Sequence, residues 1–224
     1  MTALIITGGG TPAKKNLDFY CPSPDLVIAA DSGLRTAFDA GYSVDLAVGD
    51  MDSLDDPALL DRLCEKCIER WPVDKDYTDT ELAFAAARRM GADRIILAGG
   101  GGGRLDHILS LIQLFERPDG PDIWLTDYNL VLRLAAGSVP QSLDVQTGSV
   151  PCVVSFFPVR ETAVCAVSKG LRWQLDAVNW SAAGCSLSNR ADSGSFTVQL
   201  GKGILLVILP TESKAVFSIS SVSC

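Results

Sequence analysis

The sequence contains a single histidine, His107, which excludes a metal site built from several histidine ligands. It also lacks long apolar runs, and the longest one near its end, residues 204–209, is far too short to span a bilayer. The apolar residues 3–6 have no basic region before them, so the start is not typical of a secretion signal. We therefore expect a cytoplasmic protein with no membrane partner.

Positive charge is scarce. The chain has 19 lysines and arginines against 27 aspartates and glutamates, for a net charge of −8. Proteins that bind nucleic acid or anionic membranes over a general surface are typically basic, so neither partner is expected. An anionic substrate would have to be held by a local group of cations or by a metal ion.

The cysteines do not suggest a disulfide framework, because their number, seven, is odd and they are scattered. Cys64 and Cys67 form a lone C-x-x-C, with no second pair to complete a zinc site. We interpret these two as reduced cysteines within a helix.

The first part of the chain predicts an α/β domain, residues 1–136, with a mainly parallel, doubly wound sheet. Asp56 before Pro57 predicts a helix start, and Thr78 with Glu81 predicts a capping box that opens another helix. Strands are expected at residues 3–6, 26–30, 45–48, 94–98, 123–126 and 131–134, and helices at 33–40, 57–68, 78–90 and 105–115.

The second part, residues 137–224, predicts an all-β antiparallel sandwich, because short apolar runs alternate with turn signals and no long helical pattern appears. The expected turns include residues 168–170 and 201–203. The expected strands are residues 153–157, 164–167, 171–175, 196–200, 204–209 and 216–220.

Asp50 and Asp52 follow an apolar strand that ends at Gly49. If the extended backbone continues, both carboxylates point to the same side, where they would repel each other unless a cation lies between them. Mg²⁺ typically takes one or two carboxylates together with substrate phosphates. The alternative is an acidic loop that caps the next helix.

Five glycines, residues 99–103, join a predicted strand to a predicted helix and are followed by Arg104. A glycine loop at a helix N-terminus is typical of a phosphate site, and a guanidinium can add a forked cation. The loop does not match a Walker-type P-loop. His107 can be either a catalytic residue or an ordinary helix residue.

The acidic segments and the glycine loop are expected at one edge of the predicted sheet. In doubly wound sheets, ligands bind beyond the carboxyl ends of the strands. Asp31, Asp50, Asp52, residues 74–79 and the glycine run with Arg104 and Asp106 all follow predicted strands or lie in the loops at that edge. We therefore expect acids and phosphate-binding groups to meet there.

Five motifs occur in order along the chain: Asp31-x-Gly33, Gly49-Asp50-x-Asp52-Ser53, Asp74-Lys75-Asp76-x-Thr78-Asp79, Gly103-Arg104-x-Asp106-His107 and Ser186-x-Ser188-Asn189. Together they resemble the thiamine pyrophosphokinase (thiamin diphosphokinase) family over nearly the whole chain. The resemblance implies an enzyme that transfers a diphosphoryl group from ATP to thiamine and releases AMP. It also implies Mg²⁺ as cofactor, and a homodimer in which one chain's α/β domain and the partner's sandwich share each thiamine pocket.

The resemblance also implies roles for individual residues. The metal would be held by Asp50, Asp52 and Asp79, which would form the catalytic set together with Arg104 and Asp106. Asp106 would orient or deprotonate the thiamine hydroxyl, or bind the thiazolium charge. ATP would be bound by Asp31, Gly33, Lys75, Asp76, Thr78, Gly102, Gly103 and Arg104, and thiamine by Asp106, Ser186, Ser188 and Asn189.

Two other functions fit parts of the sequence. Asp74, Asp76 and Thr78 match the D-x-D-x-T of haloacid-dehalogenase-type phosphatases, although no long apolar strand precedes them. A non-catalytic nucleotide sensor could use the glycine loop, but it would not need closely spaced acids.

Overall fold

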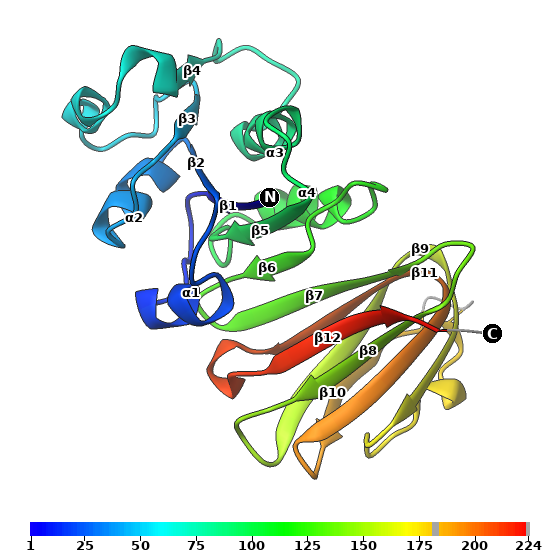
Figure 1. Cartoon of the computed structure of the whole chain (residues 1–224). Coiled ribbons are helices and arrows are strands. Elements are labelled where there is room, and N and C mark those ends of the chain that lie inside the picture. The colour runs from blue at the N-terminus through cyan, green and yellow to red at the C-terminus, as the bar shows by residue number, and fades with distance from the viewer. Residues whose placement is uncertain (181–183, 223–224) are drawn as a thin grey trace. The chain divides into compact units, whose positions relative to one another are not determined.

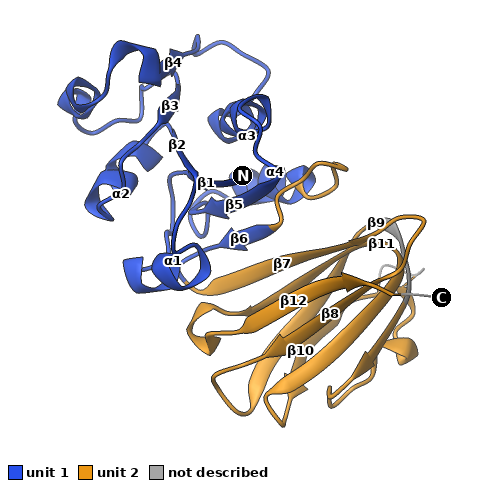
Figure 2. Cartoon of the chain, in the orientation of Figure 1, with its two compact units in different colours: residues 1–114, 123–127 blue, residues 115–122, 128–224 orange. Residues whose placement is uncertain are grey.

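The computed structural model describes residues 1–180 and 184–222, which form two compact units (Figures 1 and 2). Unit 1 comprises residues 1–114 and 123–127, and unit 2 comprises residues 115–122 and 128–224. The sequence analysis expected a boundary at residue 136, whereas unit 2 begins earlier in the chain and also includes residues 115–122. Strand β7 (Asn129–Ala136) lies in unit 2 because it pairs along its whole length with β11 (Ser195–Pro210).

Unit 1 contains a sheet in which every recorded strand pair is parallel. Its order is β6-β5-β1-β2-β3-β4. Strand β2, in the middle of this order, is apolar and buried along its whole length, as expected where helices cover both faces of a parallel sheet. The strands are β1 (Thr2–Ile6), β2 (Leu26–Ala30), β3 (Leu46–Gly49), β4 (Ile68–Arg70), β5 (Arg94–Ala98) and β6 (Ile123–Leu125).

Helices α2 (Gly33–Asp39) and α3 (Asp79–Arg89) both pack on β1 and β2, from opposite sides of the sheet (Figure 1). The other helices of this unit are α1 (Lys14–Tyr20) and α4 (Leu105–Leu114). The chain adds strands on one side of β1 up to β4 and then returns to place β5 on its other side. Such a reversal opens a crevice at the carboxyl end of the central strand, where ligands bind in sheets of this kind.

The sequence prediction was wrong for residues 57–68, which do not form one helix. Asp56 caps the start as predicted, since its side chain accepts a hydrogen bond from the backbone N of Ala58. The segment forms only two 3₁₀ helices, Pro57–Arg62 and Glu65–Cys67, because Leu63 is extended and the chain then enters the edge strand β4. Cys64 and Cys67 are joined by a disulfide and are therefore not the reduced helix residues that the sequence analysis expected.

Unit 2 is built from antiparallel strands around two long ones, β9 (Cys152–Lys169) and β11. The first part of β11 pairs with β8 (Gln141–Gln146), and its second part pairs with β7. Residues 201–203, predicted as a turn, lie within β11, where the register shifts and Gly203 has a φ of 98°. Residues 171–175 are not a strand. The remaining strands are β10 (Ser186–Ala191), which pairs with β9, and β12 (Val216–Ser221), which pairs with β8.

Within residues 1–180 and 184–222, no helix is both long and apolar enough to cross a membrane.

Candidate active site

Loops from four strand ends and from the start of two helices line a cleft of about 380 Å³ in unit 1. The lining includes residues 7–9 after β1, residues 30–32 at the end of β2, residues 78–80 at the start of α3 and residues 102–104 before α4. Ser53, His107 and Ser110 complete the polar wall. The cleft therefore lies at the carboxyl ends of the strands around β1, as the sequence analysis expected for the ligand site.

Three carboxylates meet beside this cleft. Asp31, Asp50 and Asp79 each offer one oxygen, and these oxygens all lie within 4.8 Å of one another. They come from the end of β2, the end of β3 and the first turn of α3. Asp31 has a φ of 47°, a strained conformation for a non-glycine residue, and its buried Oδ1 has no hydrogen-bond partner among the described residues.

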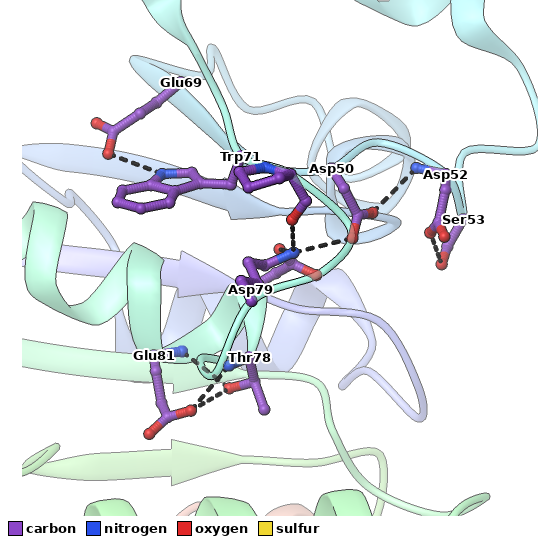
Figure 3. A network of polar contacts seen from close by, with 10 residues as sticks. Asp50, Asp52, Ser53, Glu69, Trp71, Thr78, Asp79 and Glu81 are labelled. Atoms are coloured by element: carbon purple, nitrogen blue, oxygen red, sulfur yellow. Dashed lines mark hydrogen bonds and ion pairs between the residues drawn. The ribbon is translucent and has the colours of Figure 1, made fainter.

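Lys75 neutralises part of this acidic cluster (Asp31, Asp50 and Asp79). Its Nζ lies 2.9 Å from Asp50 Oδ2 and 3.2 Å from Asp79 Oδ1. Figure 3 shows Asp50 and Asp79 approaching each other across this network of polar contacts. The side chains of Lys75 and Asp50 are only 9% and 10% exposed, so the charges are screened little by solvent.

The surroundings shift the pKa values of these groups. The hydrogen bond from Lys75 lowers the pKa of Asp50, which is therefore ionised throughout the neutral range. Burial opposes the charge of Lys75, but its hydrogen bond to Asp50 and its ion pair with Asp79 outweigh this effect and raise its pKa. Burial raises the pKa of Asp79 because its carboxylate loses water. At neutral pH the ionised carboxylate of Asp50 therefore lies beside the ammonium of Lys75.

Asp52 is not part of the acidic cluster. The prediction that Asp50 and Asp52 point to the same side assumed an extended backbone, and this assumption was wrong. Met51, between them, has a φ of 64°, which breaks the alternation of side chains. The backbone N of Asp52 donates to Asp50 Oδ1 at 3.2 Å, while its own Oδ1 accepts from Ser53 Oγ at 3.0 Å (Figure 3).

The glycine run divides into two parts. A Cβ on Gly99 would lie 2.2 Å from the Thr7 backbone oxygen, and one on Gly101 would lie 2.7 Å from Thr126 Cβ. These glycines allow the loop to pack closely against its neighbours. Gly102 and Gly103 have open space around them but φ values of 70° and 77°. Their left-handed conformation, directly before α4, is typical of backbone that presents N–H groups to an anion.

Arg104 and Asp106 form an exposed ion pair. Arg104 Nη2 lies 2.6 Å from Asp106 Oδ2, and the two side chains are 70% and 64% exposed. The hydrogen bond from Arg104 lowers the pKa of Asp106 to about 2. Arg104 and His107 line the cleft, whereas Asp106 does not. A carboxylate with so low a pKa is a weak base, which favours charge binding or orientation over proton abstraction for Asp106.

Other residues predicted to bind ATP have clear local reasons for their identity. Gly33 permits the close approach of α2 to β1, since a Cβ there would lie 2.1 Å from the Ile6 backbone oxygen. Thr78 caps α3 in the predicted capping box and also lines the cleft. Asp76 is exposed and lies outside the cleft lining.

Asp74 is also exposed, and no strand leads directly into this segment, which disfavours a phosphatase-type D-x-D-x-T site.

Apart from Asp106, which lies on α4 in unit 1, the residues predicted to bind thiamine lie in unit 2, on β10. Asn189 is fully buried, and its amide group is hydrogen-bonded to the backbone of Trp173 at both ends. Its Nδ2 also donates to Ser186 Oγ at 3.0 Å. Ser188 is exposed and has a φ of 52°. Asn189 therefore shapes the loop around Trp173, and Ser188 is the member of this motif that faces solvent.

Asp31 was predicted as an ATP-binding residue and not as a member of the acidic cluster, and Lys75 was not expected to contact this cluster. Asp31 could have been found by the rule that assigned Asp50, because both directly follow a buried strand. The position of Lys75 has no such signal, since it depends on the path of the irregular segment between β4 and α3.

Comparison with known proteins gives the same family for both parts of the chain. Residues 18–125 match the family model described as thiamin pyrophosphokinase, catalytic domain, and residues 141–205 match thiamin pyrophosphokinase, vitamin B1 binding domain. A thiamine pyrophosphokinase from Bacillus subtilis (strain 168) is 28% identical over 217 residues, which cover 94% of this chain and 99% of the relative.

Solved structures agree with this result. A thiamin pyrophosphokinase from Geobacillus thermodenitrificans is 28% identical, with a TM-score of 0.71 over 94% of this chain and 97% of the other. The thiamine pyrophosphokinase structure from Bacillus subtilis has a TM-score of 0.74 at 24% identity, covering 94% of this chain and 99% of the other, and supports the fold alone.

Proposed function

The chain belongs to the thiamin pyrophosphokinase family, and from this premise we propose that it transfers the diphosphoryl group of ATP to the hydroxyl of thiamine, giving thiamine diphosphate and AMP. One observation supports phosphoryl-transfer chemistry in particular. Acids, a glycine loop and an exposed arginine gather at one cleft, at the point where the strand order reverses. In this proposal unit 1 is the doubly wound ATP domain and unit 2 is a sandwich that contributes to thiamine binding.

We propose Mg²⁺ as the cofactor, because the residues fit it. The acidic cluster supplies only oxygen donors, which Mg²⁺ prefers, and the buried Oδ1 of Asp31 lacks a partner among the described residues. Asp31, Asp50 and Asp79 would hold the ion, which would stabilise the negative charge that grows on the transferred phosphates. Asp52 lies outside this group, and its role in metal binding stays a prediction.

The remaining residues would bind and orient the substrates. Gly102 and Gly103 would direct backbone N–H groups toward the phosphates, and Arg104 would add a forked cation. Thr78 borders the same cleft, whereas Gly33 acts through packing. Lys75 is expected to contact phosphate once nucleotide binds, and Asp76 has no contact that supports a direct role.

In unit 2, Ser188 would contact thiamine, while Ser186 and Asn189 would shape its loop.

A homodimer and a cytoplasmic location are part of the proposal. Leu105 and Leu109 are 67% and 54% exposed on α4, next to the cleft residue His107, and could be covered by a second copy of the chain. Analytical ultracentrifugation of the full chain would test the dimer.

The activity is tested by incubating the protein with ATP, Mg²⁺ and thiamine. We expect AMP and thiamine diphosphate in equal amounts, dependent on both substrates. Release of inorganic phosphate from a phosphoester without thiamine would favour a phosphatase. Nucleotide binding without AMP or thiamine diphosphate would favour a sensor.

The state of Asp106 predicts how its substitution affects the kinetics. Because its pKa is about 2, we expect Asp106→Asn to raise the KM for thiamine about 10-fold and to change kcat less, since the charge is lost but no strong base is. Steady-state kinetics with saturating ATP would measure both constants. A drop in kcat of more than about 10²-fold, with KM unchanged, would instead identify Asp106 as the general base.

A further inference from the structure

Lys75 occupies the space between two carboxylates of the acidic cluster. It lies in the irregular segment between β4 and α3, and its Nζ contacts Asp50 Oδ2 at 2.9 Å and Asp79 Oδ1 at 3.2 Å. Lys75 Nζ also donates a hydrogen bond to the backbone oxygen of Pro72 at 3.1 Å, which folds the segment back onto this ammonium. The lysine therefore contacts two of the three carboxylates that a metal ion would need.

The charges of the cluster explain why a lysine stays there. Three carboxylates within 4.8 Å of one another repel strongly where water is limited, and the side chain of Asp79 is only 23% exposed. One ammonium compensates this repulsion only in part, and Asp31 Oδ1 stays buried without a partner within the described parts of the chain. Without Lys75 or another cation, the acids would be held together against their mutual repulsion.

We propose that Lys75 is an internal counter-ion that stabilises the acidic cluster until a divalent metal binds, and that the metal then displaces its ammonium toward the triphosphate. The proposal rests on the proposed function to the extent that the cluster takes Mg²⁺. A metal at Asp50 and Asp79 would place two cations within a few ångströms of each other, which is unfavourable. The four-carbon stem of lysine and the irregular backbone around it allow the ammonium to move.

Displacement has a thermodynamic consequence. Metal binding alone must break the contacts of Lys75 with both acids, so the metal is bound weakly in the absence of nucleotide. A triphosphate offers the released ammonium a new anionic partner and so recovers the lost interaction. By linkage, metal and nucleotide each strengthen the binding of the other, and Lys75 carries part of this coupling.

The test measures metal affinity, independently of turnover. Mn²⁺ is titrated into the full chain with and without the uncleavable analogue α,β-methylene-ATP, and the dissociation constant of Mn²⁺ is measured by calorimetry or electron paramagnetic resonance. In the wild type we expect the analogue to tighten Mn²⁺ binding by at least about 10-fold. In Lys75→Met we expect Mn²⁺ alone to bind about 10-fold more tightly than in the wild type, and the analogue to have much less effect.

Two further variants make the test robust. Lys66→Met removes a lysine from the exposed surface of the second 3₁₀ helix and should behave as the wild type. If Lys75→Met unfolds without metal, Lys75→Gln removes the charge but keeps a donor for the carboxylates, and the same tighter binding of Mn²⁺ is expected.

The outcomes distinguish the displacement of Lys75 from the existence of the metal site. Equal or weaker Mn²⁺ binding in the Lys75 variants would show that the lysine stays in place beside the metal, and would overturn the displacement but not the metal site. No Mn²⁺ binding in the wild type, with or without the analogue, would overturn the metal site and this inference together.

Discussion

Replacing Asp50 by asparagine is expected to lower kcat/KM for the formation of thiamine diphosphate by about 10³-fold, which corresponds to several kcal/mol of lost charge stabilisation in the transition state. The side chain of Asp50 is 10% exposed, less than the 23% of Asp79, and its pKa is lowered by the hydrogen bond from Lys75. Asparagine keeps the shape and one acceptor oxygen but removes the charge. The loss should therefore appear in catalysis and in the Mg²⁺ concentration needed for half-maximal rate.

The control for this substitution is Asp39→Asn, which removes a carboxylate from the exposed end of α2 in the same unit. It should leave both kinetic constants within about twofold of the wild type, as is usual for surface substitutions. Circular dichroism and thermal unfolding of Asp50→Asn would show that its fold is kept. Near-normal turnover of a folded Asp50→Asn variant would refute the assignment of the acidic cluster to the metal.

Replacing Gly99 by alanine is expected to lower the free energy of unfolding by about 3 kcal/mol, because overpacking and backbone strain act together. A Cβ at this position would lie 2.2 Å from the Thr7 backbone oxygen, and the φ of 100° is one that alanine rarely adopts. Two hydrogen bonds hold the backbone in place: Gly99 N donates to Leu125 O at 2.9 Å, and Trp124 Nε1 donates to Gly99 O at 2.7 Å. Urea denaturation with linear extrapolation would measure the change.

Gly41→Ala separates the two causes. Gly41 has a φ of 80° but no atom within 4 Å of the position of a Cβ, so only the strain of a left-handed alanine applies there. We expect a loss of about 1 kcal/mol for this variant. If Gly99→Ala cost no more than Gly41→Ala, the close packing between the glycine run and β1 would not hold in solution.

Several features of the fold followed from short stretches of sequence. Strand β5 has the bounds expected from its apolar run, and the helix start at Thr78 was identified from the capping-box pattern with Glu81. These predictions succeeded because the interactions that decide them are local. A capping box needs only residues three apart, and a buried parallel strand shows as a continuous apolar run.

Predictions that extended a local rule across a backbone irregularity were wrong. Asp50 and Asp52 would share a face in an extended chain, but Met51 adopts a positive φ between them and its side chain is buried. Residues 201–203 have the composition of a turn, yet they lie inside β11, where the strand changes its partner from β8 to β7. In both cases packing with distant residues outweighs the local preference.

The sequence by itself determined the order of the motifs, the alternation of strands and helices in the first unit and the edge of the sheet at which a ligand would bind. These depend on hydrophobic periodicity and on the rule that parallel strands present their carboxyl ends together. Only the tertiary structure decided that Asp31 joins Asp50 and Asp79, that Lys75 lies between the acids, and that Asn189 is buried. Side chains from segments far apart in the chain meet at these places, and their distances depend on the packing of the whole unit.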